Sequence, residues 1–567
     1  MERRSVRIGM IAMLILVSLA GCRDESASRT SSSAAFCERL VDLQYGRIDV
    51  DHENPNEFVG HVKSLEALIE VAPAEIQKDL RFVRDKLARA RDAGGWSTLF
   101  DFAALQDPEI GNAEGRVTRF VATECGIQYG DLDWKMEPPG KAPPVCPAWP
   151  RVGSPLVRNR FPYVIATAAA NYFSAQFWSV PFLPAPDGFL RVPRGGRVVF
   201  EGEYPYARYF ALHPNDFETE NYPTLRDVDL DPDPGSANPW REPVGEGVGR
   251  HYTAQLVFTT RPEHPEPNTT YVGEAVKGGF NPAVFLIYRI YAADQGALPP
   301  NSAGVPLPAV TILDAGGEVV SHFDACDPYP PGYVVPEERS RMPWFPVPDH
   351  RAVFSPGGLN AKGNWGLPVT LLSNRDVLYL SLFHTRTRGE VFVVRARKPR
   401  TPSRRLGIPL YGRDVQIRLF TVCDYNFWNG RANDCVIDEE IPTDADGFYT
   451  LVVSDRAHRP SNATPEEGVQ WLDWGPALDG QLTYRMLLSS DDLLVGIREI
   501  VDARNAVGPA SRSDPPGSAL AAAPGNDTEI LPYVPRSAHC TREVFEAGGW
   551  QRCFEASEAG QTLNVAD

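Results

Sequence analysis

The spacing of apolar residues changes once along the chain, and this change restricts the possible folds more than any other feature. Between residues 36 and 126 apolar residues recur every three to four positions, which predicts amphipathic helices. Two such runs are Phe58, Val62, Leu65, Ile69 and Ile76, Leu80, Val83, Leu87. After about residue 160 the period becomes two, in β-branched and aromatic stretches such as "GRVVFEGEY" and "QLTYRMLLS". We therefore expect a helical unit followed by a larger β region.

The predicted helical unit has a cysteine near each end. Helices are expected around "FCERLVDLQ" and "GRVTRFVATECG", with Gly126 as the C-terminal stop of the last one. Pro73 separates the two central helices and suits the first turn of the second. Cys37 and Cys125 lie on the flanking helices, so a disulfide between them would join the two ends of the unit.

This segment resembles the cysteine-flanked helical module of exported bacterial lipoproteins. The resemblance depends on "FCERL", "APAEI" and "VATECG" and covers the helical unit alone. It implies a protein of the cell envelope. It transfers no catalytic residue.

The β region is too long for one sandwich, and an internal similarity suggests that it contains two. Tyr252-Thr253 begins a predicted strand, and a later strand carries "LIYRIYAADQ". Tyr449-Thr450 and "LTYRMLLSSDD" repeat this arrangement at a similar interval. We predict a duplicated β-domain, with copies near 185–320 and 375–500. Chance similarity between β sequences is the alternative.

The second copy resembles the C-terminal β-domain of uncharacterised two-domain exported bacterial proteins. The similarity lies in "GFYTLVVSD", a tryptophan-bearing turn and "LTYRMLLSS", in that order. The chain departs from that family at "WLDWG", which contains Trp471 and Trp474 where the family tends to have proline. The resemblance implies a fold more than a function.

The predicted fold class is α+β and multidomain, with a small N-terminal helical bundle followed by two antiparallel β-sandwich, jelly-roll-like domains. A proline-rich stretch, "EPPGKAPPVCPAWP", predicts a linker between the two parts. The expected segments are a signal peptide (1–21), a tether (22–35), the helical module (36–130), the linker (131–160), the β-domains (161–365 and 366–510) and a disulfide-closed C-terminal tail (511–567).

The N-terminal residues have the pattern of an export signal. Arg3, Arg4 and Arg7 precede an apolar stretch that is shorter than the ~20 residues of a membrane-spanning helix. The stretch ends in "LAGC", which resembles the lipobox of bacterial lipoproteins and implies cleavage before Cys22 and lipid attachment to it. The alternative is ordinary cleavage nearby that leaves a free thiol. Arg23 favours the outer membrane if the cell is Gram-negative.

Lipidation of Cys22 explains the odd number of cysteines, because the chain has nine and eight remain. Export places them in an oxidising compartment, where disulfides persist. Eight cysteines allow on the order of 100 connectivities, and sequence alone does not choose among them. Local pairs are the simplest hypothesis for Cys423 with Cys435 and for Cys540 with Cys553. With Cys37 and Cys125 assigned to the helical unit, Cys146 and Cys326 remain to pair with each other.

Composition and motifs exclude several function classes. A net charge of −17 disfavours binding to nucleic acid and, apart from the lipid anchor, to anionic membranes. No Gly-x-Ser-x-Gly, His-Glu-x-x-His or phosphate-binding glycine loop occurs. His213, His251 and His384 lie near predicted strand ends and are expected to pack or face solvent. We predict no cofactor, no metal and no catalytic residue.

Two loops carry the strongest hints of a ligand. "RDVDLDPDPG" holds Asp227, Asp229, Asp231 and Asp233, which could bind Ca²⁺, but its Asp-Pro and Pro-Gly steps favour a plain turn. "CDYNFWNGRANDC" holds three aromatic residues between cysteines, which predicts a rigid recognition loop for an envelope protein or a carbohydrate. These residues are Tyr425, Phe427 and Trp428.

The sequence therefore predicts a lipid-anchored envelope protein of binding or structural type, attached to the membrane through its N-terminal lipid. The alternative is a hydrolase of an envelope or extracellular polymer. Such an enzyme would use paired carboxylates, whose separation in space is not visible in a sequence.

Overall fold

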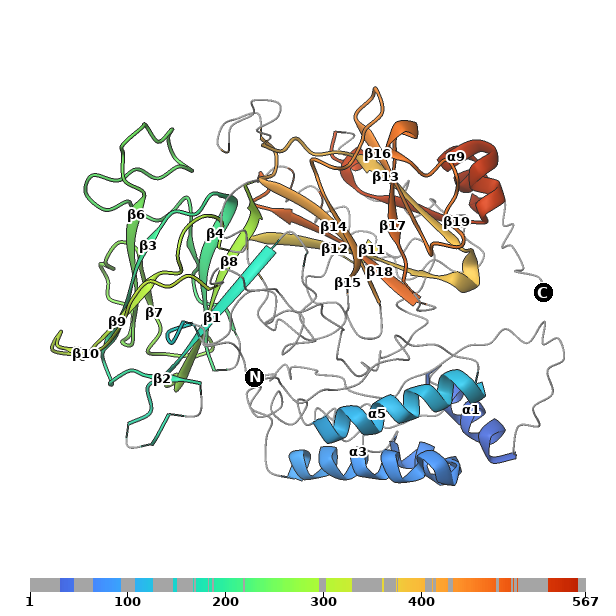
Figure 1. The fold of residues 1–567 in the computed structure, drawn as a ribbon, viewed down its shortest axis with the longest axis horizontal. Coiled ribbons are helices and arrows are strands. Elements are labelled where there is room, and N and C mark those ends of the chain that lie inside the picture. Colours follow the sequence, from blue (N-terminus) through green and yellow to red (C-terminus); the bar gives the residue numbers. More distant parts are fainter. Residues whose placement is uncertain are drawn as a thin grey trace.

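The computed structural model divides the protein into a helical unit and two β units (Figure 1). It describes residues 31–44, 65–92, 108–125, 146–149, 167, 170–181, 183–185, 188–217, 220–294, 302–328, 359–360, 374, 376–402, 410, 415–426, 432–475, 479–490, 493, 497 and 529–558. Cys22 and the predicted signal peptide lie outside these ranges. Within them, no helix combines the length and the apolar character needed to cross a membrane.

The helical unit buries the apolar face that its spacing predicts. Its elements are α1 (Ser31–Gln44), residues 65–71, α3 (Ala74–Asp92), α5 (Pro108–Phe120) and a π-helical turn, η1 (Val121–Cys125). Phe36 and Phe120 meet edge to face at 5.8 Å, while Ile76 and Leu80 of α3 are buried. Helix α1 begins inside the predicted tether, because its first turn packs Ser33 inward.

The first β unit consists of two five-stranded sheets. Their orders are β2-β1-β8-β4-β5 and β10-β9-β3-β6-β7. The strands are β1 (Ala170–Trp178), β2 (Leu190–Arg191), β3 (Arg197–Glu203), β4 (Ala207–Asn215), β5 (Leu225–Arg226), β6 (His251–Val257), β7 (Thr269–Tyr271), β8 (Ala283–Ala293), β9 (Ala309–Leu313) and β10 (Val319–Phe323).

The second β unit consists of a five-stranded and a four-stranded sheet. Their orders are β11-β12-β18-β14-β15 and β17-β16-β13-β19. The strands are β11 (Leu359–Asn360), β12 (Val377–Thr385), β13 (Val391–Arg397), β14 (Leu419–Asn426), β15 (Ala432–Ile437), β16 (Phe448–Ser454), β17 (Val469–Asp473), β18 (Asp479–Leu487) and β19 (Arg536–Cys540). Short 3₁₀ turns η3 (Arg386–Arg388), η4 (Pro465–Glu467) and η5 (Leu531–Tyr533) and a C-terminal helix, α9 (Arg542–Glu558), complete it.

The two β units have the same strand order over eight strands. β1-β8-β4-β5 in the first unit corresponds to β12-β18-β14-β15 in the second, and β9-β3-β6-β7 corresponds to β19-β13-β16-β17. The prediction of antiparallel sheets is wrong in part, because the sheets are mixed. β1 with β2, β6 with β7 and β16 with β17 pair in parallel, because each second strand of these pairs returns to the sheet edge through a connection longer than a hairpin.

Alternating side chains of β8 and β18 serve two different layers. Tyr288 and Tyr484 point into the cores of their own units. The next residues, Arg289 and Arg485, lie on the opposite faces of the same strands, because side chains alternate along a strand. The sheet that contains β8 and the sheet that contains β18 pack against each other through these faces. The contact is a shared apolar cluster that includes Tyr209. In Figure 1, β4 and β8 accordingly lie on the side of the first unit nearest to β12 and β14.

Three segments lie in different units from those that composition suggests. Trp149, in the predicted linker, is buried in the core of the first β unit, and its indole N–H donates to the Pro308 carbonyl at 2.9 Å. Strand β11 precedes the predicted boundary at residue 366 but pairs with β12 of the second unit. Strand β19 belongs to the predicted tail, yet it pairs with β13. Trp149 adds an apolar side chain to the core of the first unit, and β11 and β19 each add a strand to a sheet of the second unit.

Candidate functional site

Titratable and cationic side chains gather at one end of the second β unit, which we call the polar end. His384 comes from the end of β12 and Asp424 from β14. Arg386 and Arg388 come from η3, directly after β12, and His539 comes from β19. These residues span 156 positions of the chain, counted from His384 through His539. Strand pairing nevertheless brings them to one end of the unit.

His384 and Asp424 form a fully buried pair. The distance from His384 Nε2 to Asp424 Oδ1 is 2.6 Å, and neither side chain is exposed. The imidazole stacks on the Phe392 ring at 4.8 Å and meets the edge of Trp474 at 4.1 Å. Gly480 lies opposite His384 in the register of β12 and β18. A Cβ atom at Gly480 would lie 2.1 Å from His384 Cε1, so the ring needs a glycine beneath it.

The Asp424 carboxyl is held on both sides. Its second oxygen accepts a hydrogen bond from Asn433 Nδ2 at 3.0 Å, and the same amide donates to the Trp474 carbonyl at 2.7 Å. Burial raises the pKa of the Asp424 carboxyl well above its ordinary value, and the Asn433 hydrogen bond opposes this only in part. Protonation of the Asp424 carboxyl avoids the cost of burying its charge. The pair therefore fits a structural role in the core.

Arg386 lies between this pair and the surface. Its guanidinium donates to the Gly475 carbonyl, and its Nη1 is 3.5 Å from Asp455 Oδ2. Burial lowers the pKa of Arg386, and Asp455 opposes the shift. The Nε–H of this arginine is buried and has no hydrogen-bond partner among the described residues.

Arg388 and His539 complete the polar end. Arg388 is partly buried, burial lowers its pKa, and no carboxylate within the described ranges is paired with it. The Nε2 atom of His539 is buried and has no hydrogen-bond partner in the part of the chain that the structure describes. Burial lowers the pKa of His539 well below its ordinary value, and the neighbouring His384 and Arg388 lower it further.

A second histidine at the polar end, His458, is paired with carboxylates. His458 Nδ1 is 2.8 Å from Asp455 Oδ1, and its Nε2 is 3.6 Å from Glu390 Oε2. Glu390 also accepts the backbone N–H of Arg542 at 3.0 Å, at the start of α9. The carboxylates of Asp455 and Glu390 are thus committed to His458 and to the helix.

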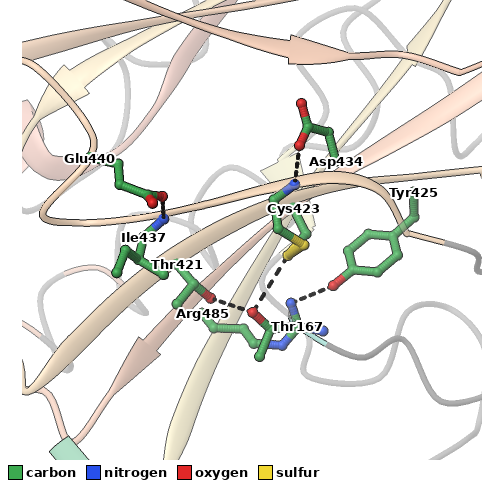
Figure 2. The surroundings of a disulfide bond; sticks show 9 residues. Thr167, Thr421, Cys423, Tyr425, Asp434, Ile437, Glu440 and Arg485 are labelled. Atoms are coloured by element: carbon green, nitrogen blue, oxygen red, sulfur yellow. Dashed lines mark hydrogen bonds between the residues drawn. A yellow bond between two sulfur atoms is a disulfide. The ribbon is translucent and has the colours of Figure 1, made fainter. Parts of the chain in front are cut away.

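The predicted recognition loop needs a correction at Tyr425. This side chain is fully buried on β14, and its hydroxyl accepts a hydrogen bond from Arg485 Nη1 at 2.7 Å. Figure 2 shows Tyr425 directed toward Arg485. Burial raises the pKa of Tyr425 to about 12, against the effect of Arg485. Tyr425 and Asp424 point to opposite faces of β14, and Tyr425 packs into the layer between the two β units. Phe427 and Trp428 lie outside the described residues.

The four predicted disulfides are confirmed. The Cα–Cα distances are 5.5 Å for Cys37–Cys125, 5.7 Å for Cys146–Cys326, 4.0 Å for Cys423–Cys435 and 5.3 Å for Cys540–Cys553. Cys423 and Cys435 face each other on β14 and β15, so they join two strands rather than enclose a free loop. The Thr167 hydroxyl lies 3.6 Å from Cys423 Sγ (Figure 2). Four disulfides indicate an oxidising compartment and hence export.

The acidic loop is organised by its neighbours in the fold. Asp227 is buried and accepts a hydrogen bond from Arg418, while Asp229 pairs with Arg226 and Asp231 with Arg241. Asp233 accepts a hydrogen bond from Thr253. Within the described ranges no group of three or more potential metal ligands converges. The turn interpretation therefore accounts for this segment.

Of the residues at the polar end, sequence analysis singled out only His384. Arg386 and Arg388 are separated by a single residue in "HTRTRG", and His539 lies in "RSAHC" more than 150 positions later in the chain. No local pattern links these segments. The available signal was the strand "EVFVVRARK", whose pairing with β19 brings His539 opposite Phe392.

Comparisons with known proteins leave the family open. No family model matches the sequence, and no curated protein is significantly similar to it. Among solved structures, an uncharacterised protein of Burkholderia cenocepacia aligns with a TM-score of 0.36 and 11% identity, over 76% of this chain and 96% of that chain. The VPA0106 protein of Vibrio parahaemolyticus aligns with a TM-score of 0.30 and 11% identity, over 59% and 87%. Both are uncharacterised bacterial proteins, and similarity at this level carries no argument about function.

Proposed function

We propose that the protein is a lipid-anchored component of the bacterial cell envelope and that it binds a ligand rather than transforming one. The observation that supports the binding role is the buried Nε2 atom of His539, which has no hydrogen-bond partner in the described part of the chain. A buried polar atom costs free energy until it gains a partner, and a bound group could be that partner.

Anchoring is supported by the N-terminal sequence and by the disulfides. "LAGC" follows an arginine-rich start and an apolar stretch, and the eight remaining cysteines pair completely. Cys22 would then be the first residue of the mature chain, with Arg23 favouring the outer membrane of a Gram-negative cell. The tether, the cysteine-flanked helical module and two β-domains of common origin would follow.

The mass of the intact protein recovered from membranes tests the anchor. We expect a chain beginning at Cys22, an added acyl mass and no thiol that reacts before reduction. A Cys22→Ala variant should lose the acyl mass and leave the membrane fraction, because a chain without acyl groups lacks the ~0.8 kcal/mol that each buried methylene contributes. An unacylated wild-type chain would overturn the anchor.

A polymer hydrolase is the second candidate. His384 Nε2 and Asp424 Oδ1 lie 2.6 Å apart, which is the spacing of a base and the group that orients it, but the pair is fully buried and would act on a polymer only after a movement that exposes it. Release of reducing sugars or peptides from purified envelope polymer, lost in His384→Gln, would support the enzyme. No release above that of the variant would exclude it for the polymers tested.

A further inference from the structure

We propose that one end of the first β unit, which we call the apolar tip, inserts into the surface of a lipid bilayer. Among the described residues seven large apolar side chains are exposed, and five of them lie at this end. These five define the tip: Leu183 (54% exposed), Val276 (40%), Phe280 (54%), Val319 (64%) and Val320 (49%). The inference rests on the membrane anchoring proposed above and adds a second contact with the same membrane.

The first sheet places two loops at the tip. β1 and β8 pair up to the last residue of β1 and the first residue of β8. Beyond this point the backbone N–H of Ser179 donates to the Pro282 carbonyl at 2.9 Å. Leu183 follows Ser179 by four positions, whereas Val276 and Phe280 belong to the hairpin that precedes Pro282. Both loops therefore leave the sheet at the same end.

The second sheet brings the start of β10 to this end. The N–H of Val192, directly after β2, donates to the carbonyl of Trp178, the last residue of β1, at 2.9 Å. β3 begins soon afterwards at Arg197, which pairs with Leu313, and Leu313 pairs in turn with Val319. Figure 1 shows β2 and β10 on the same, lower side of the first unit.

The hairpin that carries Val276 and Phe280 is held from inside and open outside. Its turn is Gly278-Gly279, with φ of +96° and +89°, and a Cβ atom at either glycine would have no neighbour within 4 Å. The backbone N–H of Val276 donates to the buried Asp216 at 2.8 Å. A fixed hairpin loses little conformational freedom when its apolar side chains are inserted, so it is pre-organised for this contact.

The irregular edge of β10 disfavours a partner protein that would add a strand. Val320 is an extra residue between Val319 and Ser321, which pair with consecutive residues of β9. Such a bulge leaves the extra residue unpaired, bends the strand and blunts the sheet edge. A bilayer accepts exposed valines at such an edge, because insertion of apolar side chains requires no strand register.

The charges near the tip suit a lipid surface without net charge. Arg191 and Arg194 are exposed beside the tip, and so are two acids, Glu274 and Glu318. These four charges cancel one another. Long basic side chains can lay their stems along apolar groups and keep their charged heads at the membrane surface. An anionic surface is disfavoured, because the chain as a whole carries a net charge of −17.

The proposed anchor makes a weak insertion sufficient. Helix α1 begins at Ser31, nine positions after Cys22. Nine extended residues span at most about 30 Å, so acylation of Cys22 would keep the protein close to the bilayer. Insertion of the tip is then an intramolecular step with a high effective concentration.

Flotation with phosphatidylcholine vesicles tests the proposal on the full mature chain carrying Cys22→Ala, which has no acyl group. We expect weak, saturable binding that persists at high salt, because salt screens charges and not apolar contacts. Phe280→Asp in this parent chain should weaken binding by roughly tenfold or more, because a carboxylate resists transfer into the acyl region. No binding by the parent, or binding that disappears at high salt, would overturn the proposal.

Val276→Asp and Val248→Asp provide a matched pair. The two valines are 40% and 42% exposed, but Val248 precedes β6 at the opposite end of the unit, where the start of β6 pairs with the end of β3. Val276→Asp should weaken vesicle binding, and Val248→Asp should bind like the parent. Both should keep the thermal transition of the parent. Equal losses in the two variants would overturn the assignment to the tip.

Phe280→Trp locates the contact without removing an apolar group. Brominated acyl chains should quench a larger fraction of the tryptophan fluorescence in this variant than in the parent, because the added indole lies in the membrane. An equal quenched fraction would overturn insertion at this position.

Sedimentation velocity distinguishes a second copy of the chain as the occupant of the tip. A dimer that Phe280→Asp dissociates, in a parent that binds no vesicles, would assign the tip to self-association and overturn the membrane contact. The intact mass of the wild-type protein tests acylation separately. A failed tip therefore remains distinguishable from a failed anchor.

Discussion

Arg418 of the second β unit donates a hydrogen bond to Asp227 of the first, with 2.6 Å between Nη1 and Oδ1. The reverse pair is present too, because Arg208 of the first unit donates to both oxygens of Asp438 of the second at 2.7 Å. All four side chains are buried. The two units therefore exchange the same interaction across their interface.

Each aspartate also binds its own unit. The second oxygen of Asp227 accepts the backbone N–H of Phe210 at 3.1 Å, and that of Asp438 accepts the N–H of Phe420 at 3.0 Å. Each carboxylate is thus also held by the backbone of its own unit. Matching contacts in both directions agree with the common strand order and favour a common origin of the units.

Removal of one member of such a pair should be costly. We expect Arg418→Met to lower the free energy of unfolding by about 3–5 kcal/mol, because Asp227 would remain buried without its cation. Asp227→Asn in the Arg418→Met background should restore part of this loss. Urea unfolding of the wild type, both single variants and the double variant measures the coupling. Additive losses would show that the pair contributes nothing of its own.

A methyl group at Gly480 should displace His384. Its Cβ would lie 2.1 Å from the imidazole, too close for any contact, so the ring or β18 must move. We expect Gly480→Ala to cost about 1–3 kcal/mol of unfolding free energy. Gly245→Ala is the control, since its Cβ would have only an ordinary contact, 3.6 Å from Val248. Equal unfolding midpoints for the two variants would contradict the close packing of His384.

The buried Asp424 should make stability depend on pH. Burial raises the pKa of its carboxyl in the folded protein, so above about pH 4 the folded chain keeps a proton that the unfolded chain has lost. Stability should then fall as the pH rises through that window, by up to about 1.4 kcal/mol per pH unit. Asp424→Asn should flatten this part of the profile. A wild-type profile that rises with pH and matches that of the variant would disprove the neutral carboxyl.

The strands could be predicted where apolar and polar residues alternate within one short stretch of sequence. "LIYRIYAADQ" and "LTYRMLLSSDD" place Tyr288 and Tyr484 at equivalent positions, and the structure buries both in equivalent cores. The disulfides were also predictable, because two pairs are local and the helical pair and the remaining pair follow from position along the chain.

The polar end was not predictable, for a physical reason. Phe392 and His539 become neighbours only when β19 adds to β13, and strand partners far apart in sequence leave no mark on local composition. Tyr425 shows the converse error. Its place among asparagines and cysteines suggested an exposed loop, but β14 continues through it, and the alternation of a strand directs its ring inward.

The Cys37–Cys125 disulfide should be the main covalent stabiliser of the helical unit. Its cysteines are 88 positions apart, and closing a loop of that size is worth about 4–5 kcal/mol in the chain-entropy model. We expect the Cys37→Ser, Cys125→Ser double variant to lose its helical circular dichroism at a lower temperature than the wild type, while the strand signal keeps its own transition. The Cys540→Ser, Cys553→Ser double variant is the comparison, since its cysteines are 13 positions apart and its loop is worth only about 3 kcal/mol. A helical transition that stays in place without Cys37 and Cys125 would mean that packing, as between Phe36 and Phe120, holds the unit without the crosslink.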